Sequence, residues 1–389
     1  MNTKDCIISN CRLLTGSKSV YSVIIQDGII SDIVSGCLNS MADINRIDAE
    51  GATLVPGFIE VHIQGAGGAD VLDSTEEALS VIAKTCARHG VTGFLATTVY
   101  RPAGNNTHLE IAADCTGKDL GGAALLGIHL EGPFIAQAKR GMIQPDCIGA
   151  PSMKVFDDLI SLTKSTLSML TLAPELDGCA EIVKRCASSG IVVSLGHTCA
   201  SFEQAMQGFS DGITHVTHFF NAMPSIHHRN PGPVIAILQS PSVSVQVIPD
   251  GVHLDKNILK FVYDTLGSDR FVTITDGIQA LGLPDGKYVY NSVEYVSRDG
   301  AARYHDGTLI GTALGQDQLL NRLIKFTGAT MEDAIKTLTL NPARVLGIDN
   351  RKGSIAKGKD ADLVLLDQEN TAVLTMVNGR IVFDKRKNG

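Results

Sequence analysis

Residues 192–219 read VVSLGHTCASFEQAMQGFSDGITHVTHF, and this stretch decides the fold. A β-rich run over Val192–Gly196 precedes helical apolar spacing over Ser201–Phe209, and a second β-rich run covers Ile213–Phe219. A strand, a helix and a strand in this order are the unit of a parallel sheet. A histidine lies at the carboxyl end of each predicted strand, so the segment predicts a βαβ unit with polar chemistry at one edge.

The same alternation continues along the middle of the chain. Six further runs have the composition of buried strands: Leu54–Ile63, Val91–Val99, Ala124–Leu130, Ser168–Ala173, Ser244–Ile248 and Phe271–Thr275. With the two strands predicted within residues 192–219 they make eight strands, the number that closes a TIM barrel. We therefore expect an α/β fold in which residues 53–349 form a (β/α)8 barrel.

The two ends of the chain differ from this middle. Both are rich in short strands joined by tight turns, such as Asp27-Gly28 and Asn378-Gly379. Two strand-rich ends around one barrel predict a single small β-sandwich domain assembled from residues 1–52 and 350–389.

Composition excludes several classes of partner. The chain of 389 residues has a net charge of -8 and no long basic run, which argues against a nucleic-acid partner. No apolar run reaches the ~18 to 20 residues that span a membrane. The nine cysteines form no C-x-x-C pair, and the N-terminus lacks the apolar core of a signal peptide. These features predict reduced thiols and a cytoplasmic protein.

Side chains capable of chemistry lie at the carboxyl ends of the predicted strands. They are His62 and Gln64, Thr97 and Thr98, His129 and Glu131, Glu175, His197, His218, Asp250 and His253, and Asp276. In a TIM barrel the active site lies at that end of the strands. The pattern therefore predicts an active site on the barrel axis.

Glu131, His197 and His218 form the candidate metal site. Two imidazoles and one carboxylate around an open position are a recognised hydrolytic arrangement, for zinc first and iron as the alternative. A single histidine at a strand end is more often an ordinary polar residue, but three ligands on different strands reverse that balance. Asp276 ends the last strand, where it can act as general acid and base. The alternative for Asp276 is a helix N-cap.

The other histidines are expected to have different roles. His129 faces inward behind the ligands, and His215 points away from the axis because side chains alternate along a strand. We expect His89, His108 and His305 at the surface.

Seven segments resemble a known family in their order and spacing: residues 56–62, 129–134, 172–175, 196–198, 217–223, 250–253 and 275–277. On these motifs the chain resembles the N-acetylglucosamine-6-phosphate deacetylase family of the amidohydrolase superfamily over nearly its whole length. The resemblance implies an amidohydrolase with one divalent metal on Glu131, His197 and His218 and with Asp276 as acid and base. It also implies substrate-binding residues, namely Met142, Ile143, Asn221, Ala222, Arg229, His253 and Leu309. Arg229 would reach the phosphate of the neighbouring subunit in a homodimer.

Two positions depart from the family pattern. The superfamily's His-x-His is His62-Ile63-Gln64 here, and an amide is a weak ligand, so a second metal at His62 and Gln64 is the weaker expectation. Ile143 occupies the place of a histidine that polarises the scissile carbonyl in one-metal members. Losing one such donor typically costs about 10²–10³ in rate. Either Gln144 or a second metal compensates, or the acyl substrate differs.

The first expectation is hydrolysis of the acetamide of N-acetylglucosamine 6-phosphate. N-acetylgalactosamine 6-phosphate remains open, because nothing in the sequence distinguishes the orientation of one sugar hydroxyl. A second reading is an amidohydrolase acting on another N-acyl or cyclic amide, although no lysine ends a predicted strand to bridge two metals. A third is a sugar-phosphate-binding or scaffolding protein with weak activity.

Overall fold

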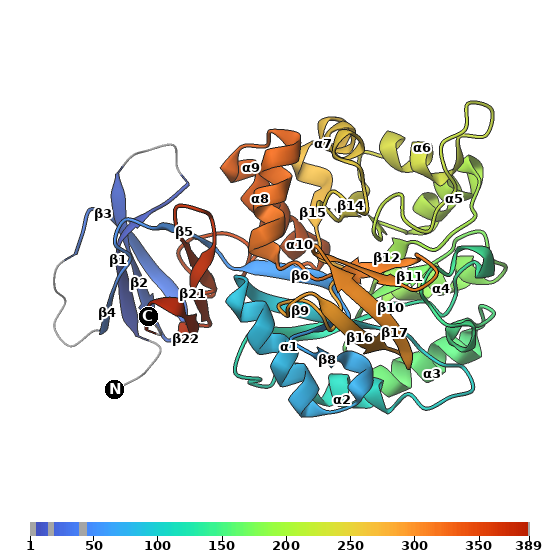
Figure 1. Ribbon diagram of the computed structural model, residues 1–389, viewed down its shortest axis with the longest axis horizontal. Helices are drawn as coiled ribbons and strands as arrows, with labels where there is room; N and C mark the ends of the chain where they lie inside the picture. Colours follow the sequence, from blue (N-terminus) through green and yellow to red (C-terminus); the bar gives the residue numbers. More distant parts are fainter. Residues whose placement is uncertain (1–4, 15–18, 39–44, 388–389) are drawn as a thin grey trace.

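The structure of the protein is a computed structural model that describes residues 5–14, 19–38 and 45–387. It has two parts that lie side by side along the long axis (Figure 1). The larger part is a barrel of parallel strands surrounded by helices. The smaller part is a sheet built from both ends of the chain.

The barrel strands are β6 (Phe58–Ile63), β9 (Val91–Thr98), β10 (Ala124–Glu131), β11 (Leu167–Leu172), β12 (Val192–Leu195), β13 (His215–Val216), β14 (Ser244–Val247) and β15 (Phe271–Thr273). Neighbouring strands pair in parallel in this order. The ring closes where Ile63 bridges Gly277 and where the Asp276 N–H donates to the His62 carbonyl at 3.0 Å. The predicted TIM-like barrel is confirmed.

Helices cover the outside of the barrel: α1 (Glu76–Arg88), α2 (Thr107–Cys115), α3 (Met153–Thr163), α4 (Cys179–Ser188), α5 (Phe202–Asp211), α6 (Gly232–Gln239), α7 (Lys256–Arg270), α8 (Gln316–Thr327), α9 (Met331–Leu338) and α10 (Leu340–Val345). α5 shows how the sequence sets a helix start. The Ser201 hydroxyl accepts the Gln204 N–H, and the Gln204 side chain accepts the Ser201 N–H, which satisfies two otherwise unpaired donors. No helix in the described part of the chain is long and apolar enough to cross a membrane.

The smaller part contains β1 (Cys6–Arg12), β2 (Val20–Gln26), β3 (Ile29–Ser35), β4 (Asn45–Asp48), β5 (Thr53–Pro56), β20 (Leu363–Leu366), β21 (Ala372–Val377) and β22 (Arg380–Asp384). Hydrogen bonds join all of them into one sheet. β5 and β20 pair antiparallel, so a strand from the first part of the chain is hydrogen-bonded directly to a strand from the last part. Residues such as Ile8, Ile25 and Leu374 pack in a core separate from that of the barrel.

The predicted strand Leu54–Ile63 is two strands, which corrects the sequence expectation. β5 belongs to the terminal sheet and β6 to the barrel, with Gly57 between them. A Cβ at Gly57 would lie 2.1 Å from the Thr92 hydroxyl oxygen, so only glycine allows this close approach. The chain therefore passes from one sheet to the other at a single residue.

A further antiparallel sheet was not predicted. It consists of β16 (Gly286–Tyr290), β17 (Val293–Arg298), β18 (Ala301–Tyr304) and β19 (Leu309–Thr312), inserted between β15 and α8. A small hairpin, β7 (Gly65–Ala66) and β8 (Ala69–Asp70), follows β6. The Thr312 N–H donates to the Asp276 carbonyl at 3.0 Å, so the end of β19 lies against the closing seam of the barrel.

The expectation of a surface position is wrong for His108 and right for His305. His108 lies in the first turn of α2 with 3% of its surface exposed, and its Nε2 donates to the Val99 carbonyl at 2.8 Å. His89 is partly buried and its Nδ1 lies 2.8 Å from Asp317 Oδ1. His215, expected to point away from the axis, is buried beside Ser244.

Candidate active site

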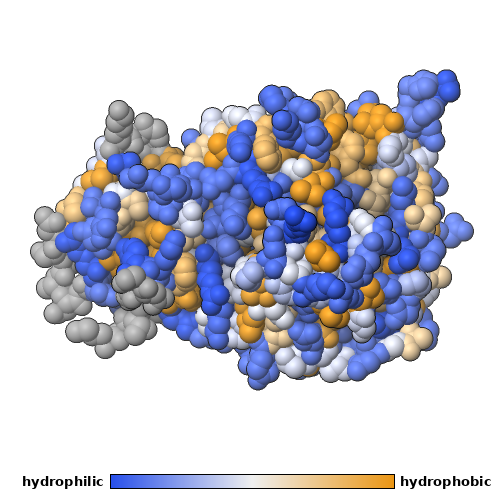
Figure 2. All heavy atoms as spheres, viewed as in Figure 1, coloured by the Kyte–Doolittle hydropathy of each residue, from blue (hydrophilic) through white to orange (hydrophobic). Residues whose placement is uncertain are grey.

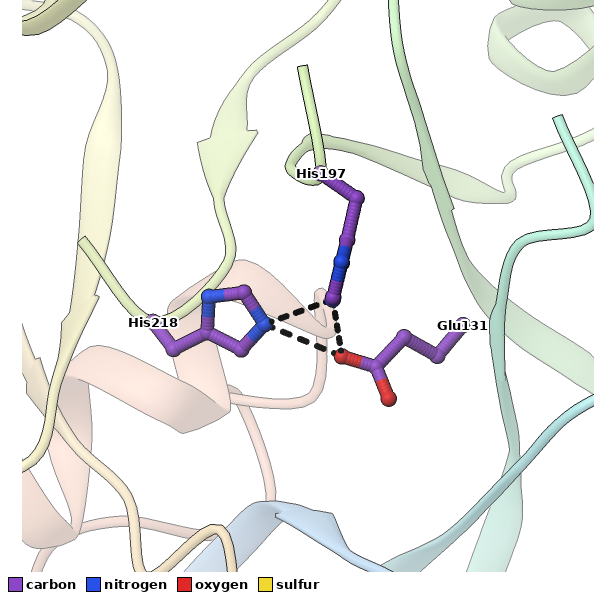
Figure 3. A group of neighbouring side chains, drawn as sticks. All are labelled: Glu131, His197 and His218. Atoms are coloured by element: carbon purple, nitrogen blue, oxygen red, sulfur yellow. Dashed lines mark hydrogen bonds and ion pairs between the residues drawn. The ribbon is translucent and has the colours of Figure 1, made fainter. Parts of the chain in front are cut away.

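Three side chains from three strand ends converge on the barrel axis (Figure 3). Glu131 is the last residue of β10, and His197 and His218 each lie two residues after β12 and β13. Glu131 Oε1 lies 3.0 Å from Nε2 of each histidine, and the two Nε2 atoms are 3.0 Å apart. All three residues are buried. The structure thus brings together the three residues predicted as metal ligands.

The backbone is left-handed where it turns these side chains toward the axis. The φ angles are 48° at His197, 26° at His218 and 50° at Asp276. A residue other than glycine held in this region costs of order 1–3 kcal/mol. Strain of this kind persists only where surrounding structure enforces it, and here it coincides with the predicted site residues.

The loop that follows β10 fixes the tautomer of His197. Its Nδ1 donates to the Lys139 carbonyl at 2.8 Å, which leaves the Nε2 lone pair facing Glu131. The Lys139 ammonium in turn donates to the Met223 carbonyl at 3.1 Å. Sequence reasoning missed Lys139, because its contribution comes from a backbone carbonyl that no residue pattern reveals.

Electrostatics keep Glu131 ionised. Burial opposes the charge, but the His62 charge and the short contacts with His197 and His218 outweigh burial and hold the pKa of Glu131 well below its usual range. Burial lowers the pKa of His218, which favours the neutral imidazole. A carboxylate beside neutral imidazoles is the protonation state that binds a cation.

Gln64 lies between the carboxylates of the site. Its Nε2 is 3.2 Å from Asp276 Oδ1, 3.4 Å from Glu131 Oε2 and 3.2 Å from His62 Nε2. Nδ1 of His62 lies 3.0 Å from Gln246 Oε1. In this orientation the amide of Gln64 presents N–H donors to both carboxylates, whereas a metal ligand would present its oxygen.

Asp276 lies three residues after β15 and is buried beside His62, with Asp276 Oδ1 3.2 Å from His62 Nε2. Burial alone would raise the pKa of Asp276, but the charge and hydrogen bond of His62 outweigh it, so the pKa is lowered. The aspartate is therefore ionised at neutral pH and able to accept a proton. This is the state that a general base requires.

A cavity of about 120 Å³ opens onto these groups. It is lined by Glu131, Gly141, Met142, His197, His218, Asn221, Ala222, His253, Asp276, Leu309 and Ile310. Most predicted substrate-binding residues thus surround one space. Its lining contains no lysine or arginine. Gly141 and Ile310 were not predicted individually, although each is the direct neighbour of a predicted residue.

Four predicted residues do not line this cavity. His62 and Gln64 lie buried behind it. Ile143 is 2% exposed and packs with Val99, Ile135 and Cys147, while its neighbour Met142 faces the cavity. Arg229 is exposed in the loop between β13 and α6, which projects from the body at the upper right of Figure 1 and is hydrophilic at its tip in Figure 2.

Comparison with known proteins identifies the family of the chain. The amidohydrolase family model matches residues 53–382. The N-acetylglucosamine-6-phosphate deacetylase of Bacillus subtilis is 33% identical over 85% of this chain and 85% of its own length. The chain belongs to the N-acetylglucosamine-6-phosphate deacetylase family of amidohydrolases. Membership in this family makes the protein a hydrolase of carbon–nitrogen bonds, as the resemblance implied.

Two further members of the family bear on substrate and structure. The N-acetylgalactosamine-6-phosphate deacetylase of Escherichia coli O157:H7 is also 33% identical, over 92% of this chain and 93% of its own. The structure of a mutant N-acetyl-D-glucosamine-6-phosphate deacetylase from Mycobacterium smegmatis, in complex with N-acetyl-D-glucosamine-6-phosphate, superposes with a TM-score of 0.88. That match has 28% identity and covers 97% of this chain and 99% of the other.

Proposed function

We propose that this deacetylase-family member hydrolyses the acetamide of an N-acetyl amino-sugar 6-phosphate, giving the amino-sugar 6-phosphate and acetate. One observation carries the proposal: the three candidate ligands and Asp276 open onto one cavity at the carboxyl end of the barrel. N-acetylglucosamine 6-phosphate is the first substrate. N-acetylgalactosamine 6-phosphate is the second candidate, because relatives named for each sugar are equally identical to this chain.

The residues fit a divalent cation, which we propose to be zinc, with iron as the alternative. Glu131 Oε1 and the two Nε2 atoms lie within 3.0 Å of one another, and His197 has the tautomer of a ligand. When bound there, such an ion lowers the pKa of a water and polarises a carbonyl oxygen. A neutral amide is a weaker metal ligand than a carboxylate or an imidazole, so the site at His62 and Gln64 is the weaker candidate for a second ion.

Asp276 carries the proton in this proposal. Its ionised carboxylate accepts the proton of the attacking water and then delivers it to the nitrogen of the leaving amine. His62 and Gln64 hold the carboxylate in place through contacts of 3.2 Å each. Because the aspartate is buried, bulk water does not compete for the transferred proton.

A phosphate needs a cation that the cavity lining lacks. We propose that Arg229 of a second copy supplies it in a homodimer, since the arginine is exposed on a projecting loop and its planar fork suits phosphate. Asn221, Ala222 and His253 line the cavity where they can hold the sugar, together with Met142 and Leu309.

The side chain of Ile143 does not polarise the scissile carbonyl, because it has no hydrogen-bond donor and packs in an apolar cluster. Gln144, one candidate replacement, donates instead to the Met142 carbonyl at 3.1 Å and does not line the cavity. We therefore propose that Ile143 shapes the loop that carries Met142 and makes no contact with the acyl group.

The decisive experiment measures acetate released from both sugar phosphates together with the metal content of the purified protein. About one metal ion per chain and acetate release from either sugar support the proposal. A metal-free active protein, or no acetate from either sugar, contradicts it and favours another amide substrate or a binding role.

Seven cysteines are buried as thiols, which fits the cytoplasm that we propose as the location.

The role of Arg229 has its own test. Arg229→Met should raise KM for the phosphorylated substrate far more than it changes turnover of the unphosphorylated sugar. Arg185→Met, at an exposed arginine on α4, is the matched control and should change neither. Equal effects of Arg229→Met on both substrates, or a monomeric active protein, would remove the shared role.

A further inference from the structure

Asp250 and His253 form a hydrogen-bonded pair beside the catalytic aspartate. The Nδ1 atom of His253 lies 2.7 Å from Asp250 Oδ2, and both side chains are almost fully buried. A carboxylate only accepts hydrogen bonds, so the shared hydrogen lies on Nδ1. The other ring nitrogen, Nε2, is 3.8 Å from Asp276 Oδ2, and His253 and Asp276 line the same cavity.

The turn that holds the pair is rigid. Asp250 Oδ1 accepts the N–H groups of Val252 and His253, both at 2.8 Å. Between them Gly251 has a φ of 74°, and a Cβ there would lie 2.9 Å from the ring of Phe326 on α8. The backbone is thus fixed independently of the hydrogen bond that Nδ1 of His253 donates to Oδ2, so Oδ2 acts only on the orientation of the ring.

The tautomer decides what His253 offers to the cavity. With the hydrogen on Nδ1, Nε2 is an acceptor and can take the hydrogen of a hydroxyl group. With the hydrogen on Nε2, the ring would donate toward Asp276 Oδ2 and compete for the carboxylate that must accept a proton from water. The first tautomer leaves Asp276 free for its role.

We propose that Asp250 is a positioning residue that holds His253 as the Nδ1–H tautomer, so that Nε2 accepts a hydrogen bond from a ring hydroxyl of the sugar. The inference rests on the proposed function for the identity of the substrate. The tautomer part rests only on the contacts of the pair. Asp250 therefore acts on specificity through His253 and does not itself touch the substrate.

Asp250→Asn tests the inference with little change in shape. The asparagine oxygen can still accept the two backbone N–H groups, but its amide donates to Nδ1 and moves the ring hydrogen to Nε2. Asp255→Asn is the matched control, because Asp255 caps α7 in the same segment and does not contact His253. Circular dichroism and metal content should be the same in both variants.

The first readout is ¹⁵N NMR of histidine-labelled protein, with the His253 signals identified by their loss in His253→Gln. The wild type should show the Nδ1–H form and Asp250→Asn the Nε2–H form. A wild-type spectrum with the hydrogen on Nε2 overturns the inference without any variant, and so does an unchanged tautomer in Asp250→Asn. These spectra need no substrate, so they remain informative if the proposed function fails.

The second readout compares the substrate with analogues that lack the hydroxyl at C3 or at C4. Wild type should discriminate against one analogue by about 10- to 100-fold in kcat/KM, the usual effect of leaving a buried hydrogen-bonding group without its partner. In Asp250→Asn that discrimination should weaken, because an Nε2–H group can no longer accept the hydroxyl hydrogen and is turned toward Asp276 as well, while Asp255→Asn keeps it. Unchanged discrimination in Asp250→Asn overturns the substrate part. Absence of acetate from both sugar phosphates in the wild type overturns the proposed function instead.

Discussion

The buried His108 makes the stability of the protein depend on pH in a predictable window. Burial lowers the pKa of His108 to about 4, from an ordinary value of 6.5, because the imidazolium would lose its hydration. In the unfolded chain the side chain regains its ordinary pKa. Between these two values the unfolded state binds more protons than the folded state, so stability falls as pH falls.

The size of the effect follows from the two pKa values. Each unit of difference corresponds to about 1.36 kcal/mol, and the contribution is fully present only above the unfolded value. Lowering the pH from about 7 to about 5 should therefore remove about 2 kcal/mol of unfolding free energy through this one residue. The loss ends as pH passes below the folded pKa of about 4.

The perturbation is His108→Gln, which can keep an N–H donor for the Val99 carbonyl but does not titrate. Urea unfolding of wild type and variant is followed at both pH values by circular dichroism, since the chain has no tryptophan. Between about pH 7 and about pH 5 the unfolding free energy of the variant should fall by about 2 kcal/mol less than that of wild type. His305→Gln, at an exposed histidine, should behave as wild type. Equal losses in wild type and His108→Gln would refute the reasoning.

Three further predictions concern the candidate active site. Asp276→Asn should lower kcat by about 10²–10⁴-fold with metal content unchanged, measured by acetate release and elemental analysis; near-normal turnover would exclude it as the base. His62→Gln removes the charge that lowers the pKa of Asp276, so the acid limb of the kcat profile should move to higher pH, whereas an unmoved limb would contradict the assignment. Glu131→Gln should lose its metal on dialysis, and full metal retention by this variant would remove Glu131 from the ligand set. Wild type that a chelator has stripped of metal should regain activity when zinc is added.

The barrel could be predicted because its strands are buried on both sides. Strands such as β9 and β10 are therefore rich in apolar and β-branched residues along their whole length, and the sequence shows them directly. The inserted sheet of β16–β19 lacks this signal. Its hairpin carries Val289 and Val293 at the surface, so no apolar run marks it. The break at Gly57 also escaped prediction, since it results from the approach of Thr92, which is distant in sequence.

The candidate site was predictable where strand ends define it and unpredictable where loops do. Glu131, His197 and His218 lie at or just after the ends of strands that a parallel barrel must bring together. The orientation of Met142 and Ile143 depends on the irregular segment after β10, which has no period to indicate which side chain faces the cavity. His108 was misplaced because its polar side chain lies on the buried side of α2, a position set by one hydrogen bond.

The left-handed backbone at His197, His218 and Asp276 has a consequence for protein engineering. A residue other than glycine pays about 1–3 kcal/mol to adopt these angles, and glycine does not. Replacing any of the three residues by glycine therefore relieves this backbone strain and at the same time deletes a functional side chain. Selection for heat resistance alone therefore places no restraint on the loss of these side chains. A thermostable variant of this protein should be obtained under simultaneous selection for turnover, with mutations drawn from the outer helices and the terminal sheet.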